Sequence, residues 1–270
     1  MHQAKLKAWI IRLIGPRMIK VIKQLLGYAR FDEVDLVHAA FSEIKRTGTM
    51  VDVGAHHGSS LGRFAADGWR VLAFEPDNNN RAILEIAHGH RQPLTVDKRA
   101  VAETAARGRS FYASNVSSGI SGLSAFHVSH QQRQRVDVTT LAEALPAYGI
   151  HRLDFLKIDT EGHDLFVLQG VDWEAVMPSV VVCEFENRKS IPLGYNTADL
   201  VAYLAGQGYE VRISEWMPIV EYGSAHTWKG FAVDVSSLDD DAWGNLIAYL
   251  PDTPIARSIA RQIDAKRDRV

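Results

Sequence analysis

The chain has 270 residues, 46% of them hydrophobic, which suffices for one large α/β core and argues against extensive disorder. Thirty basic side chains against 32 acidic ones leave a net charge of -2, so we expect no nucleic-acid partner. The single cysteine, Cys183, excludes a disulfide framework. Since no apolar run near the N-terminus is long enough for a signal peptide or a membrane span, we expect a cytoplasmic protein.

Residues 1–30 carry seven lysines and arginines and no acid. Apolar residues recur at helical spacing on both sides of the Gly15-Pro16 break, which predicts two short basic amphipathic helices. Two roles fit this arm. Its apolar face packs on the body of the protein, or it lies peripherally on an anionic membrane with Trp9 at the headgroup boundary.

From Thr49 the sequence alternates between strand and helix patterns. The predicted order is strand, helix, strand, helix, strand over residues 49–55, 59–68, 69–76, 78–90 and 93–101. This alternation predicts a parallel sheet with helices on both faces. Residues 108–138 are rich in serine and glycine, and they predict a short strand followed by a loop long enough to cover a site.

The alternation resumes after this segment. Helices are predicted over residues 139–149, 163–171 and 197–208, and strands over 153–162, 179–187, 209–216 and 228–236. The segments 238–250 and 254–270 read as helical and charged. The chain is therefore divided into an N-terminal basic helical arm (1–47), an α/β domain (48–236) and a C-terminal helical tail (237–270).

The stretch "VDVGAHHG" is a glycine turn between a strand and a helix, which aims backbone N–H groups at a ligand. It lacks both the G-x-G-x-x-G of dinucleotide enzymes and the lysine of phosphate-binding loops, which disfavours a dinucleotide oxidoreductase. Glu75 follows Gly54 by 21 residues, where a carboxylate suits a ribose diol. Because Asp52 adds negative charge near the turn, we expect S-adenosylmethionine, which carries an ammonium and a sulfonium group.

Three segments, "VDVGAHHG", "FEPDNNN" and "LDFLKIDTEGHDLFVLQG", resemble the FkbM family of class I S-adenosylmethionine-dependent methyltransferases. The resemblance covers roughly residues 48–235. It implies a Rossmann-like, doubly wound sheet of seven strands, mostly parallel with the last strand antiparallel. The acceptor is expected over the fourth and fifth strands. The cofactor residues that it implies are Asp52, Gly54, Ala55, His56, Gly58, Glu75, Pro76, Asp77, Ser121 and Asp159.

Acidic side chains gather where the fourth and fifth strands end. Because a hydroxyl is a poor nucleophile at neutral pH, its methylation needs a base or a metal. We expect the base to be Asp159, Glu161 or His163, with Asp159 nearest the methyl group. The alternative is a divalent metal such as Mg²⁺ on Asp159, Glu186 and Asn187, an arrangement that resembles catechol O-methyltransferase-like enzymes.

Family resemblance points to a hydroxyl of a sugar or of a polyketide-like natural product as the acceptor. Aromatic rings commonly pack against sugar rings, which favours O-methylation of a sugar, glycan or glycolipid. A small-molecule natural product and a non-catalytic adenosine-binding scaffold are the alternatives. The predicted acceptor residues are Glu184, Trp216, Tyr222 and His226.

Overall fold

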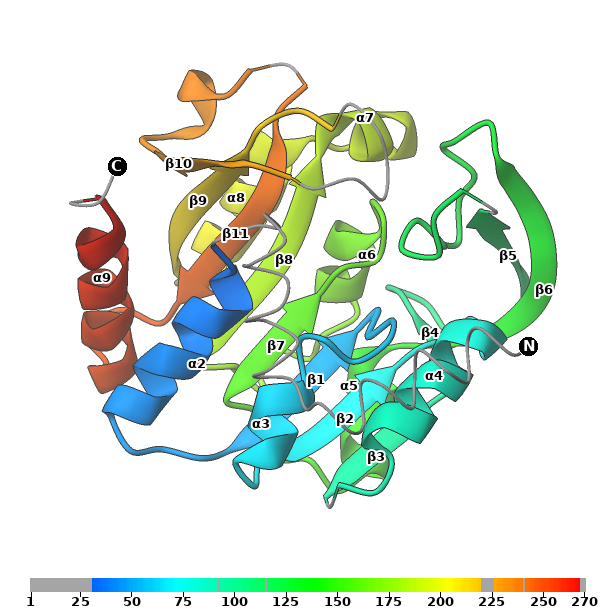
Figure 1. The fold of residues 1–270 in the computed structure, drawn as a ribbon, viewed down its shortest axis with the longest axis horizontal. Coiled ribbons are helices and arrows are strands. Elements are labelled where there is room, and N and C mark those ends of the chain that lie inside the picture. Colours follow the sequence, from blue (N-terminus) through cyan, green and yellow to red (C-terminus); the bar gives the residue numbers. More distant parts are fainter. Residues whose placement is uncertain (1–30, 92, 115, 220–225, 240, 268–270) are drawn as a thin grey trace.

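A central sheet organises the part of the chain that the computed structural model describes, residues 31–91, 93–114, 116–219, 226–239 and 241–267 (Figure 1). Within these residues the sheet has eight strands: β1 (Thr49–Val53), β2 (Arg70–Phe74), β3 (Leu94–Asp97), β7 (Phe155–Ile158), β8 (Val180–Glu186), β9 (Glu210–Trp216), β10 (Trp228–Ala232) and β11 (Trp243–Tyr249). Their order across the sheet is β10-β9-β11-β8-β7-β1-β2-β3.

The five strands from β3 to β8 run parallel, as predicted. In β1, β2, β7 and β8 both faces are buried, so their sequences are nearly continuous apolar runs. In the register, Val53 pairs with Phe74 on one side and with Ile158 on the other. The chain therefore leaves β1, β2 and β7 at the same edge of the sheet, and the residues that follow these strands meet there.

The helix predicted over residues 238–250 is wrong, because residues 243–249 form β11. This strand lies antiparallel between β8 and β9. Leu246 and Ala248 face one hydrophobic core, whereas Ile247 and Tyr249 face the other. An apolar run buried on both faces has no period that separates strand from helix. The strand predicted to be the last one is the shorter β10 at the sheet edge. With β11 added, the described sheet has eight strands and not seven.

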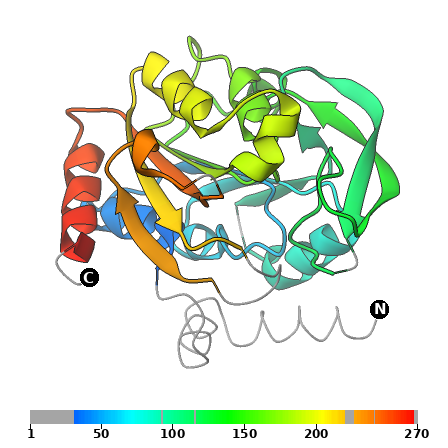
Figure 2. The same cartoon turned by 90° about the horizontal axis from the view of Figure 1, so that it is seen from above.

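Helices cover both faces of the sheet (Figures 1 and 2). One face carries α2 (Glu33–Glu43), α3 (Gly62–Ala66), α4 (Asn78–His88) and α9 (Pro254–Arg267), and the other carries α5 (Leu141–Ala147), α6 (Asp164–Gln169) and α8 (Thr197–Gly206). The described residues also form the short helices α7 (Asn187–Ser190), η1 (Ile191–Leu193) and η2 (Val235–Ser237). Among these described helices, none has the length and apolar character needed to cross a bilayer.

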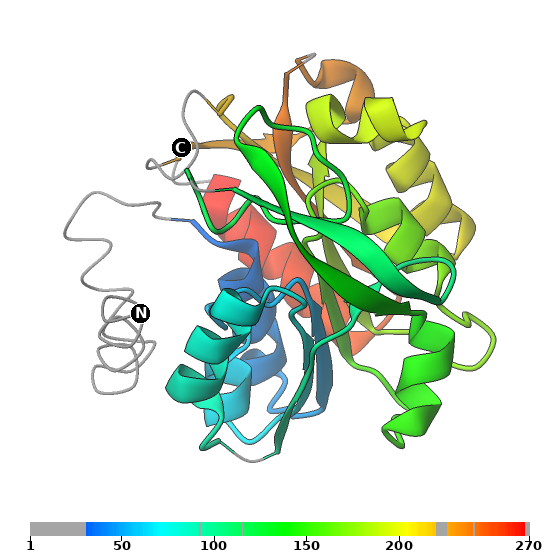
Figure 3. The same cartoon turned by 90° about the vertical axis from the view of Figure 1, so that its right-hand side faces the viewer.

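A second, smaller sheet stands beside the carboxyl edge of the first (Figure 3). It consists of β4 (Ala100–Val101), β5 (Ala106–Ser114) and β6 (His130–Thr139), in the order β4-β6-β5. The prediction of one short strand and a loop over residues 108–138 thus missed the long strand β6. Its first half, "HQQRQR", is polar and has no buried side chain, so it lacks the apolar alternation that would indicate a strand. The intervening loop extends toward the first sheet.

Candidate active site

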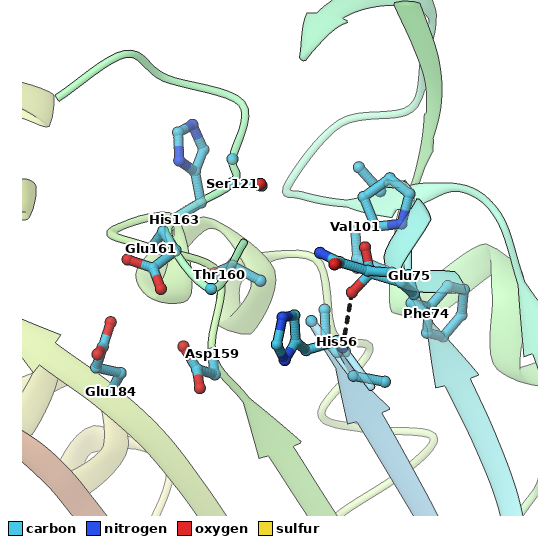
Figure 4. A pocket seen from close by; sticks show the side chains of 18 of the residues that line it. His56, Phe74, Glu75, Val101, Ser121, Asp159, Thr160, Glu161, His163 and Glu184 are labelled. Carbon is cyan, nitrogen blue, oxygen red and sulfur yellow. Dashed lines mark hydrogen bonds between the residues drawn. The ribbon is translucent and has the colours of Figure 1, made fainter. Parts of the chain in front are cut away.

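A pocket opens where β1, β2, β7 and β8 end, with the β5–β6 loop as one wall (Figure 4). It offers about 220 Å³ of space. Ten of the predicted site residues line it: Gly54, Ala55, His56, Glu75, Pro76, Ser121, Asp159, Glu161, His163 and Glu184. Figure 4 shows two groups, with His56 and Glu75 on the β1–β2 side and Asp159, Glu161 and Glu184 on the β7–β8 side.

The turn after β1 requires glycine at position 54. Gly54 has a φ of 80°, and a Cβ there would lie 1.9 Å from the carbonyl oxygen of Asp159. The N–H groups of Gly54 and Ala55 both donate to the Phe74 carbonyl at 3.0 Å. The turn after β1 is therefore packed against the ends of both neighbouring strands. Gly58 does not line the pocket and abuts His88 behind the turn.

Glu75 lies at the end of β2 and faces the pocket. Its carboxylate accepts the N–H of His56 at 2.6 Å and the N–H of Asp77 at 2.8 Å. Burial raises the pKa of Glu75 to about 7 despite these hydrogen bonds. Asp77 itself caps α4 by accepting the N–H groups of Asn79 and Asn80, so it orients the loop instead of lining the pocket.

Asp52 is fully buried below the pocket and does not line it. Burial raises the pKa of Asp52 to about 6. The ammonium of Lys157 lies 3.7 Å from Asp52 Oδ1 and 3.1 Å from Asp159 Oδ2, and Lys157 does line the pocket. Asp52 thus acts on the site indirectly, as a charged partner of Lys157. Sequence analysis missed Lys157 as a site residue, although a lysine inside a buried strand was a visible signal.

Three carboxylates converge on the β7–β8 side. One oxygen from each of Asp159, Glu161 and Glu184 lies within 4.8 Å of the others. Burial raises the pKa of Glu161 to about 7, whereas the ammonium groups of Lys157 and Lys189 outweigh burial at Asp159 and lower its pKa. Asp159 is therefore ionised at neutral pH, and Glu161 is poised between its two forms.

His163 lines the pocket as a neutral imidazole. Burial lowers the pKa of His163 to about 4, and its Nε2 lies 3.4 Å from Ser124 Oγ of the β5–β6 loop. The same loop contacts the glycine turn, since Ser118 Oγ lies 2.9 Å from His56 Nε2 and the Ser118 carbonyl accepts from Asn80. Sequence analysis missed Ser118 and Asn80, because nothing in their local sequence indicates that distant loops meet.

The predicted aromatic acceptor residues are placed differently. Trp216 lies in the hydrophobic core, where its Nε1–H donates to Glu33 at 2.7 Å, so it cannot stack on an acceptor in the pocket. His226 does not line the pocket and packs edge-on against Trp243 at a centroid distance of 4.9 Å. Tyr222 lies outside the described residues.

Two of the predicted metal ligands, Asn187 and Glu186, have other partners. Asn187 Oδ1 accepts the N–H and the Oγ–H of Thr197, both at 2.9 Å. Glu186 pairs with Arg188 at 2.9 Å and with Lys189 at 2.8 Å. The acids that converge are Asp159, Glu161 and Glu184. Asp159 and Glu161 follow β7, and Glu184 lies in the paired strand β8, so the three side chains reach the same edge of the sheet.

Comparison with known proteins adds one decisive finding. The profile of the methyltransferase FkbM domain matches residues 52–211, which is more than half of the chain. The chain belongs to the FkbM methyltransferase family. This FkbM protein is thus an S-adenosylmethionine-dependent methyltransferase, as the three sequence segments predicted. No curated protein matches it.

Solved structures similar to this FkbM protein are distant. Precorrin-6y C5,15-methyltransferase from Geobacter metallireducens is 12% identical, over 83% of this chain and 95% of that chain, at a TM-score of 0.40. Magnesium protoporphyrin IX methyltransferase from Synechocystis with bound SAM is 11% identical, over 81% of this chain and 78% of that chain, at a TM-score of 0.43. These similarities are too weak to bear on the acceptor.

Proposed function

We propose that this FkbM protein transfers the methyl group of S-adenosylmethionine to a hydroxyl of a sugar, glycan or glycolipid. One observation carries the proposal: Asp159, Glu161 and Glu184 converge within 4.8 Å on one wall of the pocket. Carboxylates accept hydrogen bonds from hydroxyls, and one of them can accept a proton. A wall of three carboxylates therefore suits an acceptor with several hydroxyls.

The β1–β2 side of the pocket fits the cofactor. The Gly54 turn leaves no room for a side chain, so the ligand meets backbone there. Glu75 has an unusually buried carboxylate that suits the two hydroxyls of a ribose. Asp159 is the member of the carboxylate wall that lies toward His56 (Figure 4). When bound, S-adenosylmethionine supplies a methyl group on a positively charged sulfur.

The proton of the acceptor hydroxyl must leave as the new carbon–oxygen bond forms and the carbon–sulfur bond breaks. Glu161 is suited to take it, because a pKa of about 7 keeps a large fraction ionised while giving good basicity. Asp159 stays ionised and supports the developing charge distribution, while the buried His163 remains neutral. The carboxylates also align the hydroxyl for in-line attack, which supplies much of the rate.

A second candidate is metal-assisted methylation of a small natural product. The grouping of Asp159, Glu161 and Glu184 favours it, since oxygen ligands at this spacing suit a hard cation. The ammonium of Lys189 argues against it, because it lies 2.6 Å from Glu161 and 2.9 Å from Glu184.

The test is a screen of radiolabelled methyl transfer from S-adenosylmethionine into fractionated cell glycans, lipids and small molecules. We expect label in glycan or glycolipid fractions, and no loss when EDTA is added. Loss of activity with EDTA and recovery with Mg²⁺ would establish the metal-assisted reaction instead. If calorimetry shows cofactor binding but no fraction takes up label, the chain is a non-catalytic scaffold.

We also propose that the basic arm contacts anionic membranes. Residues 1–30 lie outside the described residues, so the argument rests on their seven cations. Each cation near an anionic surface contributes about 1 kcal/mol, an attraction that salt screens. The full chain is expected to sediment with anionic vesicles at low salt and to be released by high salt. A chain lacking residues 1–30 should not sediment but should bind the cofactor normally; unfolding of this variant would mark the arm as a packing element.

A further inference from the structure

Lys189 is a buried lysine at the end of the carboxylate wall. Its side chain is 2% exposed, and its Nζ lies 2.6 Å from Glu161 Oε2, 2.9 Å from Glu184 Oε2 and 2.8 Å from Glu186 Oε2. The ring of Phe126, from the β5–β6 loop, has its centre 5.4 Å from the same nitrogen. One ammonium thus joins residues from three separate segments at the pocket.

The backbone around Lys189 is built for this contact. Glu161 has a φ of 57°, an unusual value for a residue other than glycine. Gly162 follows with a φ of 93°, and a Cβ there would lie 2.9 Å from the Cβ of Lys189. The turn after β7 therefore brings the Glu161 carboxylate onto the ammonium only because Gly162 lets α7 pack closely.

The ammonium already pairs with two of the three acids that a metal ion would need. Glu161 and Glu184 belong to the group whose oxygens are spaced for a cation, and both direct their Oε2 atoms at Lys189 Nζ. A divalent ion between them would face a fixed positive charge at less than 3 Å from its own ligands. Repulsion at that range in a buried site is large.

We propose that Lys189 is the fixed cation of the acceptor site, a positioning residue that holds Glu161 and Glu184 in place so that methyl transfer needs no divalent metal. That this part of the pocket binds the acceptor rests on the proposed function. The charge balance concerns this chain alone: one ammonium lies among Glu161, Glu184 and Glu186, and its removal leaves three buried acids that must bind protons or another cation.

The experiment is a manganese titration followed by electron paramagnetic resonance. Lys189→Met is expected to bind one Mn²⁺ at least about tenfold more tightly than the wild type, since the affinity of oxygen sites follows their ligand charge. Lys189→Arg, which keeps the charge, should show no gain. The matched control is Lys229→Met, which removes an ammonium from Glu215 (2.7 Å) and Asp239 (2.8 Å) away from the pocket and should show no gain either.

Two further measurements place the ion and test its role. Adding Glu184→Gln to Lys189→Met should abolish the gained Mn²⁺ signal. With an acceptor in hand, wild-type turnover should be indifferent to EDTA, whereas Lys189→Met should become dependent on added Mg²⁺ or Mn²⁺. A purely structural lysine would produce no metal dependence.

Equal Mn²⁺ affinity in the wild type and Lys189→Met would overturn the inference, whether both bind or neither does. If Lys189→Met does not fold, Lys189→Met with Glu186→Gln, which buries one charge fewer, takes its place and must show the same gain. The titration needs no acceptor, so it decides the role of Lys189 even if the methylation screen fails.

Discussion

Asp159→Asn is expected to lower the turnover of methyl transfer by about 10²–10³-fold, the usual effect of removing one group that stabilises charge at the reacting centre. The substitution keeps the shape of the side chain but removes the carboxylate that lies between His56 and the other two acids (Figure 4). It also leaves Lys157 with a weaker partner. Gly54 packs against the backbone of Asp159, which the substitution leaves unchanged. The affinity for S-adenosylmethionine, measured by calorimetry, should therefore stay within a few-fold of the wild-type value.

Glu161→Gln is the companion variant, which removes the proposed base, and the pH dependence separates the roles of the two acids. Burial raises the pKa of Glu161 to about 7, so this carboxyl is protonated below that pH and can act as a base only above it. The wild-type kcat/KM should therefore rise with pH through about 7. Asp159→Asn should keep this rise and Glu161→Gln should lose it. Full turnover in Asp159→Asn would remove Asp159 from the reaction.

Glu75→Ala is expected to weaken S-adenosylmethionine binding by about 1.5–3 kcal/mol, the range for removing a charged hydrogen-bond partner. The carboxylate faces the pocket and also fixes the N–H groups of His56 and Asp77. Its loss removes the ribose acceptor and loosens both loops. Calorimetric titration measures the change, and a melting curve establishes that the variant is folded.

The control for this prediction is Glu85→Ala. Glu85 is an acid of α4 whose side chain is 55% exposed, so this variant should bind the cofactor with unchanged affinity. Because burial raises the pKa of Glu75 to about 7, wild-type affinity should fall as pH drops below that value, and Glu75→Gln should lack this dependence. Unchanged affinity in folded Glu75→Ala would remove this residue from the cofactor site.

The lining of the proposed cofactor side of the pocket was largely predictable from local sequence. A glycine turn after a buried strand, followed by a glutamate at the end of the next, determines where backbone and carboxylate meet, because parallel strands end at a common edge. Gly54, Ala55, His56, Glu75 and Pro76 all line the pocket. The acceptor side was predicted as a set of acids at two strand ends, but not as the particular group that converges.

The misses share a physical cause. Trp216 was predicted to contact the acceptor, yet it is buried in the hydrophobic core, where its Nε1–H donates to the side chain of Glu33, far away in the sequence. The segment that forms β11 was predicted as a helix. It becomes a strand because it pairs with both β8 and β9, and these distant partners cannot be inferred from the local sequence pattern.

The sequence by itself determined the parallel α/β core, the glycine turn, the position of Glu75 and the family, because each depends on residues within one strand–turn–helix unit. Only the tertiary structure decided which acids meet and what neutralises them. Asp159 and Glu161 follow β7, Glu184 belongs to β8 and the ammonium comes from α7, so their contact depends on strand pairing and on the fold of the Gly162 turn. Charge balance in a buried site is a property of distances in space, and spacing along the chain does not encode it.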